Sequence, residues 1–241
     1  MQKPVSEVDS RRARRQSRAR SAAPADAQVI DALWLDTLQR ICARAAHEIK
    51  GALNGVSVNL EVVRARAERP DAQASAVEPY AATAAEQLAA VISMTEAVLT
   101  LARPAREPLE IGPFVRRLDA LLAPFARADG RRLEIAEAME TAGRSTAPAN
   151  AVRLAVAAAL LDALEQSASV TCRPMPASFG ADAAAPTGRL CIESADGSRL
   201  TIRQDIAAAV GAAGIRMTTE HAGLTITFPC AGDDERRLET S

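Results

Sequence analysis

The chain has 241 residues, of which 48% are apolar and only 2% are aromatic, and its formal net charge at pH 7 is -1. This length allows one or two domains with a sizeable core, and the balanced charge excludes a polycation or a polyanion as a whole. With so few aromatic residues, Ala, Val and Leu must fill the core, which suits helix packing.

The four cysteines are scattered along the chain and show no metal-ligand spacing, so we expect them to be reduced packing residues. They are Cys42, Cys172, Cys191 and Cys230. The sequence shows no signal peptide and no 18-residue run free of charge. We therefore expect a cytoplasmic protein without a membrane span.

Residues 1–27 carry six arginines between Arg11 and Arg20, among Ser, Ala and Gln. Such a composition cannot bury a core, and it predicts a disordered basic arm. A basic arm can bind nucleic acid or an acidic membrane through phosphate contacts, although a solvated tail is the more frequent outcome.

The spacing of apolar residues predicts a first helix from about residue 28 to residue 67. The steps of three and four residues mark one face of an amphipathic helix. That face is formed by Leu38, Ile41, Ala45, Ile49, Leu53, Val56, Leu60 and Val63. The helix should end before Pro70, since proline disfavours helical geometry in the residue before it.

His47 lies outside this apolar face. At about 100° per residue it points roughly to the opposite side, so we expect its imidazole to face solvent. Arg44, Lys50 and Asn54 lie close to it on the polar side, and Glu48 follows it directly. A lone surface histidine on a helix usually has no role, but a carboxylate beside it and cations one turn away make this surface unusual.

A second helical pattern runs from about residue 77 to residue 103 and ends at Pro104. Two long helices joined by a short turn form an antiparallel hairpin. One hairpin buries little apolar area, whereas two related by a twofold axis form a four-helix bundle, so we predict a homodimer. A hairpin that serves oligomerisation alone would have the same pattern.

After residue 106 the chain alternates between helical and strand-like segments. We predict helices at about 111–127, 150–166 and 205–213, and short strands at about 132–136, 169–173, 189–194, 199–203, 215–219 and 224–228. Helices on one side of a mixed sheet form an α/β sandwich. The fold class is therefore α+β, with a hairpin at 28–105, a sandwich at 106–231 and a polar tail at 232–241.

The string HEIKGAL from His47 to Leu53 resembles the H-box of the sensor histidine kinases, whose dimerisation helix reads H-E-[IL]-[KR]-[NT]-P-L. Five of the seven positions match. Gly51 stands where the family has Asn or Thr, and Ala52 where it has Pro. The resemblance implies a dimeric bundle with two exposed phosphoacceptor histidines, and the change at Gly51 speaks against strong phosphatase activity.

The order of elements after residue 106 resembles the ATP-binding domain of the same kinases, the Bergerat fold, but the ATP motifs are missing. Ala159 and Ala163 align with the N-box asparagines. The nearest string to the D-x-G-x-G box is Asp196-Gly197, which is more typical of a hairpin turn. No glycine occurs at 202–206, where the lid is expected. Phosphate cradles need glycines and magnesium needs oxygen ligands, so we predict a degenerate domain that does not use ATP.

A phosphoacceptor histidine without an ATP site predicts a histidine phosphotransferase in a two-component phosphorelay, and the chain resembles bacterial proteins of this design. We expect His47 to carry a phosphoryl group between receiver-domain aspartates. Glu48 can accept the Nδ1 proton and orient the ring. Arg44 and Lys50 can offset phosphoryl charge, and Asn54 can contact a docked receiver.

The expected partners are a second copy of the chain and the receiver domains of response regulators or of a hybrid histidine kinase. The receiver brings its own magnesium, so we expect no cofactor and no metal site in this chain. Two other functions stay open. One is a divergent histidine kinase with an unrecognised ATP site, and the other is a non-enzymatic pseudokinase that binds and sequesters response regulators.

Overall fold

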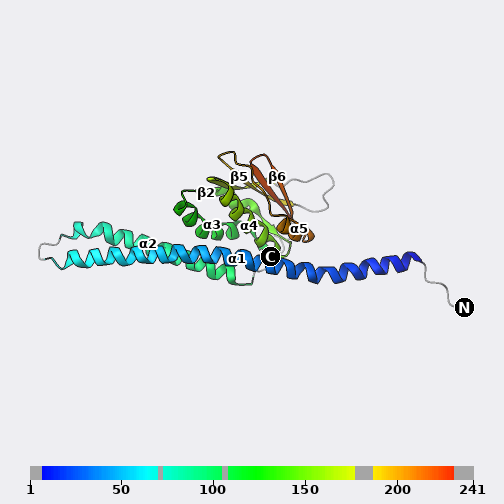
Figure 1. Ribbon diagram of the computed structural model, residues 1–241, viewed down its shortest axis with the longest axis horizontal. Coiled ribbons are helices and arrows are strands. Elements are labelled where there is room, and N and C mark those ends of the chain that lie inside the picture. The colour runs from blue at the N-terminus through cyan, green and yellow to red at the C-terminus, as the bar shows by residue number, and fades with distance from the viewer. Residues whose placement is uncertain (1–6, 70–72, 105–107, 177–186, 231–241) are drawn as a thin grey trace, which may run out of the picture.

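The computed structural model describes residues 7–69, 73–104, 108–176 and 187–230, with side chains from residue 26 onward. Its fold is α+β, with mostly helical content and a five-stranded sheet. Two long antiparallel helices form an extended hairpin, and an α/β unit lies along one side of it (Figure 1).

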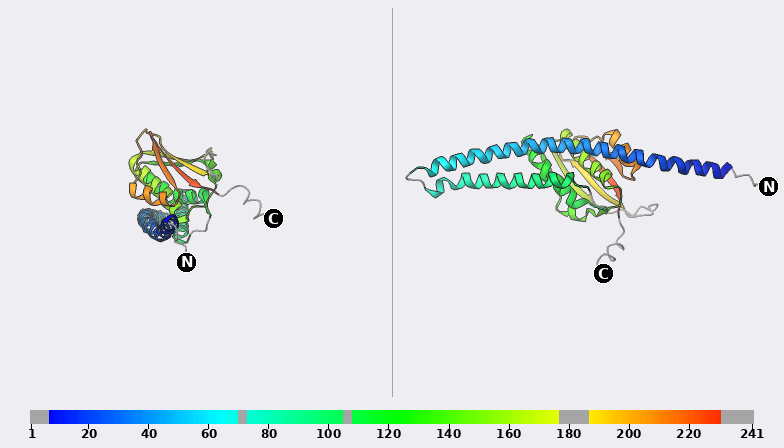
Figure 2. Two further views of the ribbon diagram at one scale, coloured as in Figure 1. Left: turned by 90° about the vertical axis from the view of Figure 1, so that its right-hand side faces the viewer. Right: turned by 90° about the horizontal axis from the view of Figure 1, so that it is seen from below.

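The hairpin consists of α1 (Glu7–Ala67) and α2 (Glu78–Ala102), with the short 3-10 helix η1 (Ala74–Ala76) between them. Both helices end just before the prolines that the sequence predicts as stops. With 61 residues, α1 is about 90 Å long at 1.5 Å per residue. It extends past the α/β unit at its N-terminal end, while the tip of the hairpin extends past it at the other (Figures 1 and 2).

The structure differs from the sequence prediction at the N-terminus. The basic arm at 1–27 is predicted to be disordered, whereas α1 already begins at Glu7. Alanine, arginine and glutamine have high helix propensity, which allows this segment to continue a helix that is anchored further along. Residues 1–6 and the predicted tail at 232–241 lie outside the described residues.

The two helices of the hairpin pack closely at Gly55. A Cβ atom at this position would lie 2.5 Å from the Gln87 side chain, so a larger residue would have to displace that side chain. Gln87 also accepts a hydrogen bond from Asn59 at 3.3 Å. Closer to the tip, the Arg66 guanidinium lies 4.6 Å from the centre of the Tyr80 ring.

The predicted apolar face of α1 is covered only in part. Ile41 and Ala45 are buried, but Leu53 is 43% exposed and Leu60 is 53% exposed. The reason is that α2 packs on the side of α1 that carries Gly55, which is turned away from Leu53 and Leu60 on a helix of 3.6 residues per turn. A stripe of apolar side chains therefore remains open on the single chain.

In the described residues after 107, the α/β unit has three α-helices and a mixed sheet. The helices are α3 (Ile111–Ala128), α4 (Ala149–Gln166) and α5 (Gln204–Ala212). The strands are β2 (Arg132–Ile135), β4 (Ser169–Met175), β5 (Thr187–Ser194), β6 (Arg216–Glu220) and β7 (Gly223–Pro229). Their order in the sheet is β2-β4-β5-β7-β6, and only β2 and β4 pair in parallel.

The helices cover one face of the sheet and separate it from the hairpin (Figures 1 and 2). In β7 the buried side chains Leu224, Ile226 and Phe228 alternate with half-buried threonines, as expected for a sheet with one covered face. Three short elements of the α/β unit escaped prediction: the paired strands β1 (Leu109–Glu110) and β3 (Arg144–Ser145), and the 3-10 helix η2 (Glu137–Ala142).

One predicted strand and one predicted hairpin turn are wrong. Residues 199–203 form no strand, and the turn at Asp196-Gly197 does not join two strands of the sheet. Instead, the chain leaves β5 at this turn and runs to the start of α5. The Gln166 side chain holds this segment by accepting hydrogen bonds from the backbone N–H and hydroxyl of Thr201, at 2.7 and 2.8 Å. Residues 199–203 therefore have the residue pattern of a strand, but the backbone N–H of Thr201 donates its hydrogen bond to a helix side chain and not to a neighbouring strand.

Candidate functional site

His47 is exposed on α1, as the helical periodicity predicts. Two residues before it, Ala45 is buried in the core cluster, and it is the last fully buried residue of α1 before the imidazole. A Cβ atom added at Gly51, one turn further along, would meet nothing within 4 Å. The surface beside His47 is therefore open to a partner.

The other predicted site residues on this stretch lie on α1 around His47. Lys50 and Asn54 are exposed, and Glu48 is half-buried. Among the described residues, no side chain hydrogen-bonds the His47 imidazole, and consecutive residues of a helix point about 100° apart. The orienting role of Glu48 and the partner contacts of Lys50 and Asn54 stay predictions.

Arg44 is placed differently from the sequence prediction, which assigns it to phosphate. Its Nη2 atom lies 2.5 Å from Oε1 of Glu165 on α4, and its guanidinium stacks 4.3 Å from the centre of the Phe125 ring on α3. Arg40, one turn earlier, donates to the same Glu165 oxygen at 2.9 Å. Arg44 is thus part of the interface between α1 and the α/β unit, and a phosphate contact would require it to leave Glu165.

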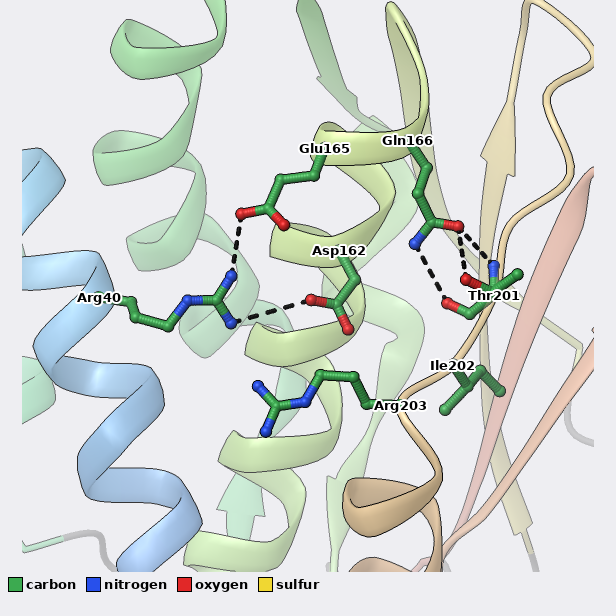
Figure 3. Close-up of a pocket in the computed structure, with 7 residues that line it drawn as sticks. All are labelled: Arg40, Asp162, Glu165, Gln166, Thr201, Ile202 and Arg203. Atoms are coloured by element: carbon green, nitrogen blue, oxygen red, sulfur yellow. Dashed lines mark hydrogen bonds and ion pairs between the residues drawn. The ribbon is translucent and has the colours of Figure 1, made fainter.

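A pocket of about 380 Å³ lies where α1 meets α4 (Figure 3). Its lining residues come from α1, from α4 and from the segment before α5; they are Arg40, Asp162, Glu165, Gln166, Thr201, Ile202 and Arg203. Two of the charged groups are paired. Arg40 binds Glu165 within the pocket, and Arg203 binds Asp205, which is not a lining residue, through two hydrogen bonds of 2.8 and 3.3 Å.

Two carboxylates of this pocket have pKa values shifted in opposite directions. Asp162 is only 9% exposed, and its nearest cationic atom is Nη1 of Arg40 at 3.9 Å. Burial raises the pKa of Asp162, and the charge of Arg40 only partly offsets this. Burial also acts to raise the pKa of Glu165, but hydrogen bonds and charge from Arg44 and Arg40 outweigh it and leave that pKa below its usual value.

The positions that correspond to nucleotide-binding motifs have other roles in the structure. Ala159 and Ala163 are buried in the core and do not line the pocket. The Asp196 carboxylate accepts hydrogen bonds from the backbone N–H of Ala168 at 2.7 Å and of Ser198 at 2.9 Å, and from the hydroxyl of Ser194. These hydrogen bonds lower the pKa of Asp196 and hold the end of β5 in place.

Within the described part of the chain, no cluster of three or more His, Cys, Asp or Glu side chains could hold a metal ion. A second hollow of about 450 Å³ lies on the open face of the sheet and was not predicted. It contains the ion pair between Arg173 and Glu193, with N–O distances of 2.7 and 3.1 Å. Alternation of polar residues along β4 and β5 is the only sequence pattern that points to this face.

No protein-family model matches the chain, and no curated protein matches it either. Among solved structures, the histidine kinase AdeS of Acinetobacter baumannii matches with a TM-score of 0.36 and 10% identity, over 77% of this chain and 98% of the AdeS chain. A similarity of this size carries no argument about function, which depends on the chain's own residues.

Proposed function

We propose that this protein is a cytoplasmic histidine phosphotransferase that carries a phosphoryl group on His47 between receiver-domain aspartates and does not use ATP itself. The observation that carries the proposal is the placement of His47. Its imidazole is exposed, within a string that resembles an H-box, on a helix that is bound to the α/β unit through Arg44, three residues earlier.

In the proposed reaction, Nε2 of His47 attacks the phosphorus of a phospho-aspartate in line with the leaving carboxylate. The P–O bond to the aspartate breaks as the N–P bond forms, and the reverse reaction delivers the phosphoryl group to a second receiver. Glu48 takes up or shares the Nδ1 proton, and Lys50 offsets phosphoryl charge. The receiver supplies the magnesium ion.

Three features speak against ATP as the phosphoryl donor. The aligned N-box positions are buried alanines. The carboxylate expected to recognise adenine, Asp196, is taken up by the protein's own hydrogen bonds. Residues 202–206, where the lid is expected, contain no glycine whose backbone could approach a phosphate closely, and Gln166 ties the adjacent Thr201 to α4.

The proposed active form is a homodimer in which two hairpins form a four-helix bundle. On α2 the exposed side chains Leu88, Ile92 and Leu99 recur at steps of four and seven residues, and Leu53 and Leu60 form a similar stripe on α1. Such spacing is typical of a helix–helix seam. α2 is also long and apolar enough to cross a membrane by length and composition alone; a second copy that covers this stripe accounts for the same apolar residues.

Intact mass after reaction tests the proposal. Wild-type protein incubated with a phosphorylated receiver domain should gain one phosphoryl group that is stable at neutral pH, whereas His47→Ala should gain none. The chain has only two histidines, so His221→Ala is a matched control and should be labelled like the wild type.

The same measurement separates the alternatives. Labelling of His47 by Mg-ATP alone would show a divergent kinase and overturn the proposal. If a panel of phosphorylated receivers binds the protein and none transfers its phosphoryl group, the sequestering pseudokinase becomes the better explanation.

A further inference from the structure

The part of α1 from Ile30 to Ala45 lies in the same core as the α/β unit. Ile30, Trp34, Ile41 and Ala45 belong to one continuous cluster of buried residues with side chains of α3, α4 and the sheet. The Trp34 ring meets Phe114 of α3 edge-on, with 6.5 Å between ring centres. The helix that carries His47 is therefore a core element of the α/β unit and not only a surface on which that unit rests.

Polar contacts follow the same stretch of α1 at its margin. Near one end, Asn150 on α4 donates a hydrogen bond of 2.8 Å to Asp31. About 20 Å further along the helix, at 1.5 Å per residue, Glu165 accepts hydrogen bonds from both Arg40 and Arg44. Glu165 thus binds two cations of α1, and the second of them, Arg44, lies three residues before His47.

Beyond Ala45 the surroundings of α1 change. From residue 46 to the end of the helix no residue is fully buried, and Ile49 is a partly buried side chain of this stretch that still packs against the core cluster. His47 lies at this boundary, three residues after Arg44. The turn of α1 that carries His47 therefore lies between a stretch of the helix with fully buried residues and a more exposed one, directly after the hydrogen bonds to Glu165.

We propose that Glu165 is a positioning residue for His47. By holding Arg40 and Arg44 on α4, it extends the rigid α/β unit to the turn of α1 that carries the imidazole. A receiver then meets His47 and the α/β surface in one fixed arrangement, so docking costs less ordering entropy than it would on two parts that move independently. The consequence for docking depends on the proposed phosphotransfer, whereas the rigid connection itself does not.

The test compares Glu165→Gln with Glu193→Gln in the full-length protein. Both glutamate side chains are 42% exposed and both bind arginine, but Glu193 lies on the open face of the sheet, away from α1. Loss of a charge-assisted hydrogen bond should open the helix locally, so amide hydrogen exchange in residues 40–48 should be roughly tenfold faster in Glu165→Gln. Glu193→Gln should leave exchange in this stretch unchanged.

Kinetics with a phosphorylated receiver give the second measurement. KM should rise about fivefold in Glu165→Gln with kcat nearly unchanged, because ordering is lost and the reacting groups are intact. Labelling of His47 by phosphoramidate, a small donor that needs no docking, should be the same in both variants. An equal rise of KM in Glu193→Gln would overturn the proposal.

The hydrogen-exchange measurement tests the role of Glu165 independently of the proposed phosphotransfer. If the wild type accepts no phosphoryl group from any receiver, the exchange rates of residues 40–48 still decide whether Glu165 fixes this turn. Unchanged exchange in Glu165→Gln would overturn the inference even if phosphotransfer occurs.

Discussion

Asp162 and Glu165 lie one turn apart on α4 and respond to pH in opposite ways. Glu165 is stabilised as a carboxylate by two arginines, whereas Asp162 is buried, and the charges of Arg40, at 3.9 Å, and of Arg203 only partly offset that burial. The folded state therefore holds a proton on Asp162 more strongly than the unfolded chain does, and holds one on Glu165 less strongly. Each shift gives a stability effect with its own sign.

Replacing Asp162 with asparagine should stabilise the protein at pH 7 by about 1 kcal/mol, because it removes a poorly solvated charge. The penalty that ionised Asp162 imposes is present above its raised pKa and disappears as the pH falls through that pKa, so wild type and variant should converge in acid. Urea unfolding at pH 7 and pH 4 measures this. A variant less stable than the wild type at pH 7 would mean that the attraction of Arg40 outweighs burial.

Glu165→Gln should change the stability at pH 7 in the direction opposite to Asp162→Asn. The stabilisation from Glu165 is present above its unfolded pKa, near 4.5, and is lost as the pH falls through its lowered folded pKa. The variant should therefore be less stable than the wild type at pH 7 and should approach it in acid. The same sign of pH dependence in both variants would contradict the assignment.

The residues of the candidate site differ in how far the sequence could predict them. The exposure of His47 follows from helical periodicity, which is a local property. The location of Arg44 depends on Glu165, 121 residues further along, and no spacing rule connects the two. An arginine near a histidine suggests a phosphate contact by type and distance, but a pairing across the fold becomes visible only when α1 and α4 are side by side.

For the helices, the apolar stripe on α2 predicts how two chains associate. Glutamate in place of Ile92 would put a charge in the centre of the proposed seam, where burying an unpaired charge is costly. Wild-type protein should sediment as a dimer and Ile92→Glu as a monomer. Val58→Glu, at an exposed valine of α1 outside the stripe, is the control and should stay dimeric. A monomeric wild type at micromolar concentration would refute the homodimer.

Most helices and strands could be predicted from the sequence because each shows the spacing of apolar residues that is typical of its own type of secondary structure. The bounds of α2, α3, α4 and β7 agree with the prediction to within two residues. The failure at 199–203 has a physical cause. Alternation shows that a segment is extended and half-covered, but whether it pairs with a strand depends on a neighbour that the local sequence does not contain.

At the scale of the whole molecule, the shared core makes the hairpin base and the α/β unit one cooperative body. Ile41→Ala removes a fully buried side chain of α1 and should cost about 2–4 kcal/mol. Because that side chain is part of the common core, helix and sheet should still unfold in a single transition. Val58→Ala, at an exposed position, should change stability by less than about 0.5 kcal/mol.

The test of a single transition is denaturant unfolding at one protein concentration. Far-ultraviolet circular dichroism follows the helices, and hydrogen exchange of the sheet amides follows the sheet. Two separated transitions, with the α/β unit still folded after the base of α1 has melted, would refute a common core. In that case the predicted hairpin at 28–105 and the predicted sandwich at 106–231 would be two units that unfold independently.

Trp34 is the only tryptophan of the chain, and it lies 6% exposed between Phe114 and the guanidinium of Arg153. The protein thus carries a single tryptophan, which can be excited selectively over Tyr80, in the core shared by the hairpin base and the α/β unit. The wavelength and the intensity of its emission should change when the packing of α1 on the α/β unit changes. Docking of a partner near α1 can therefore be titrated optically on unlabelled protein, without attaching a dye.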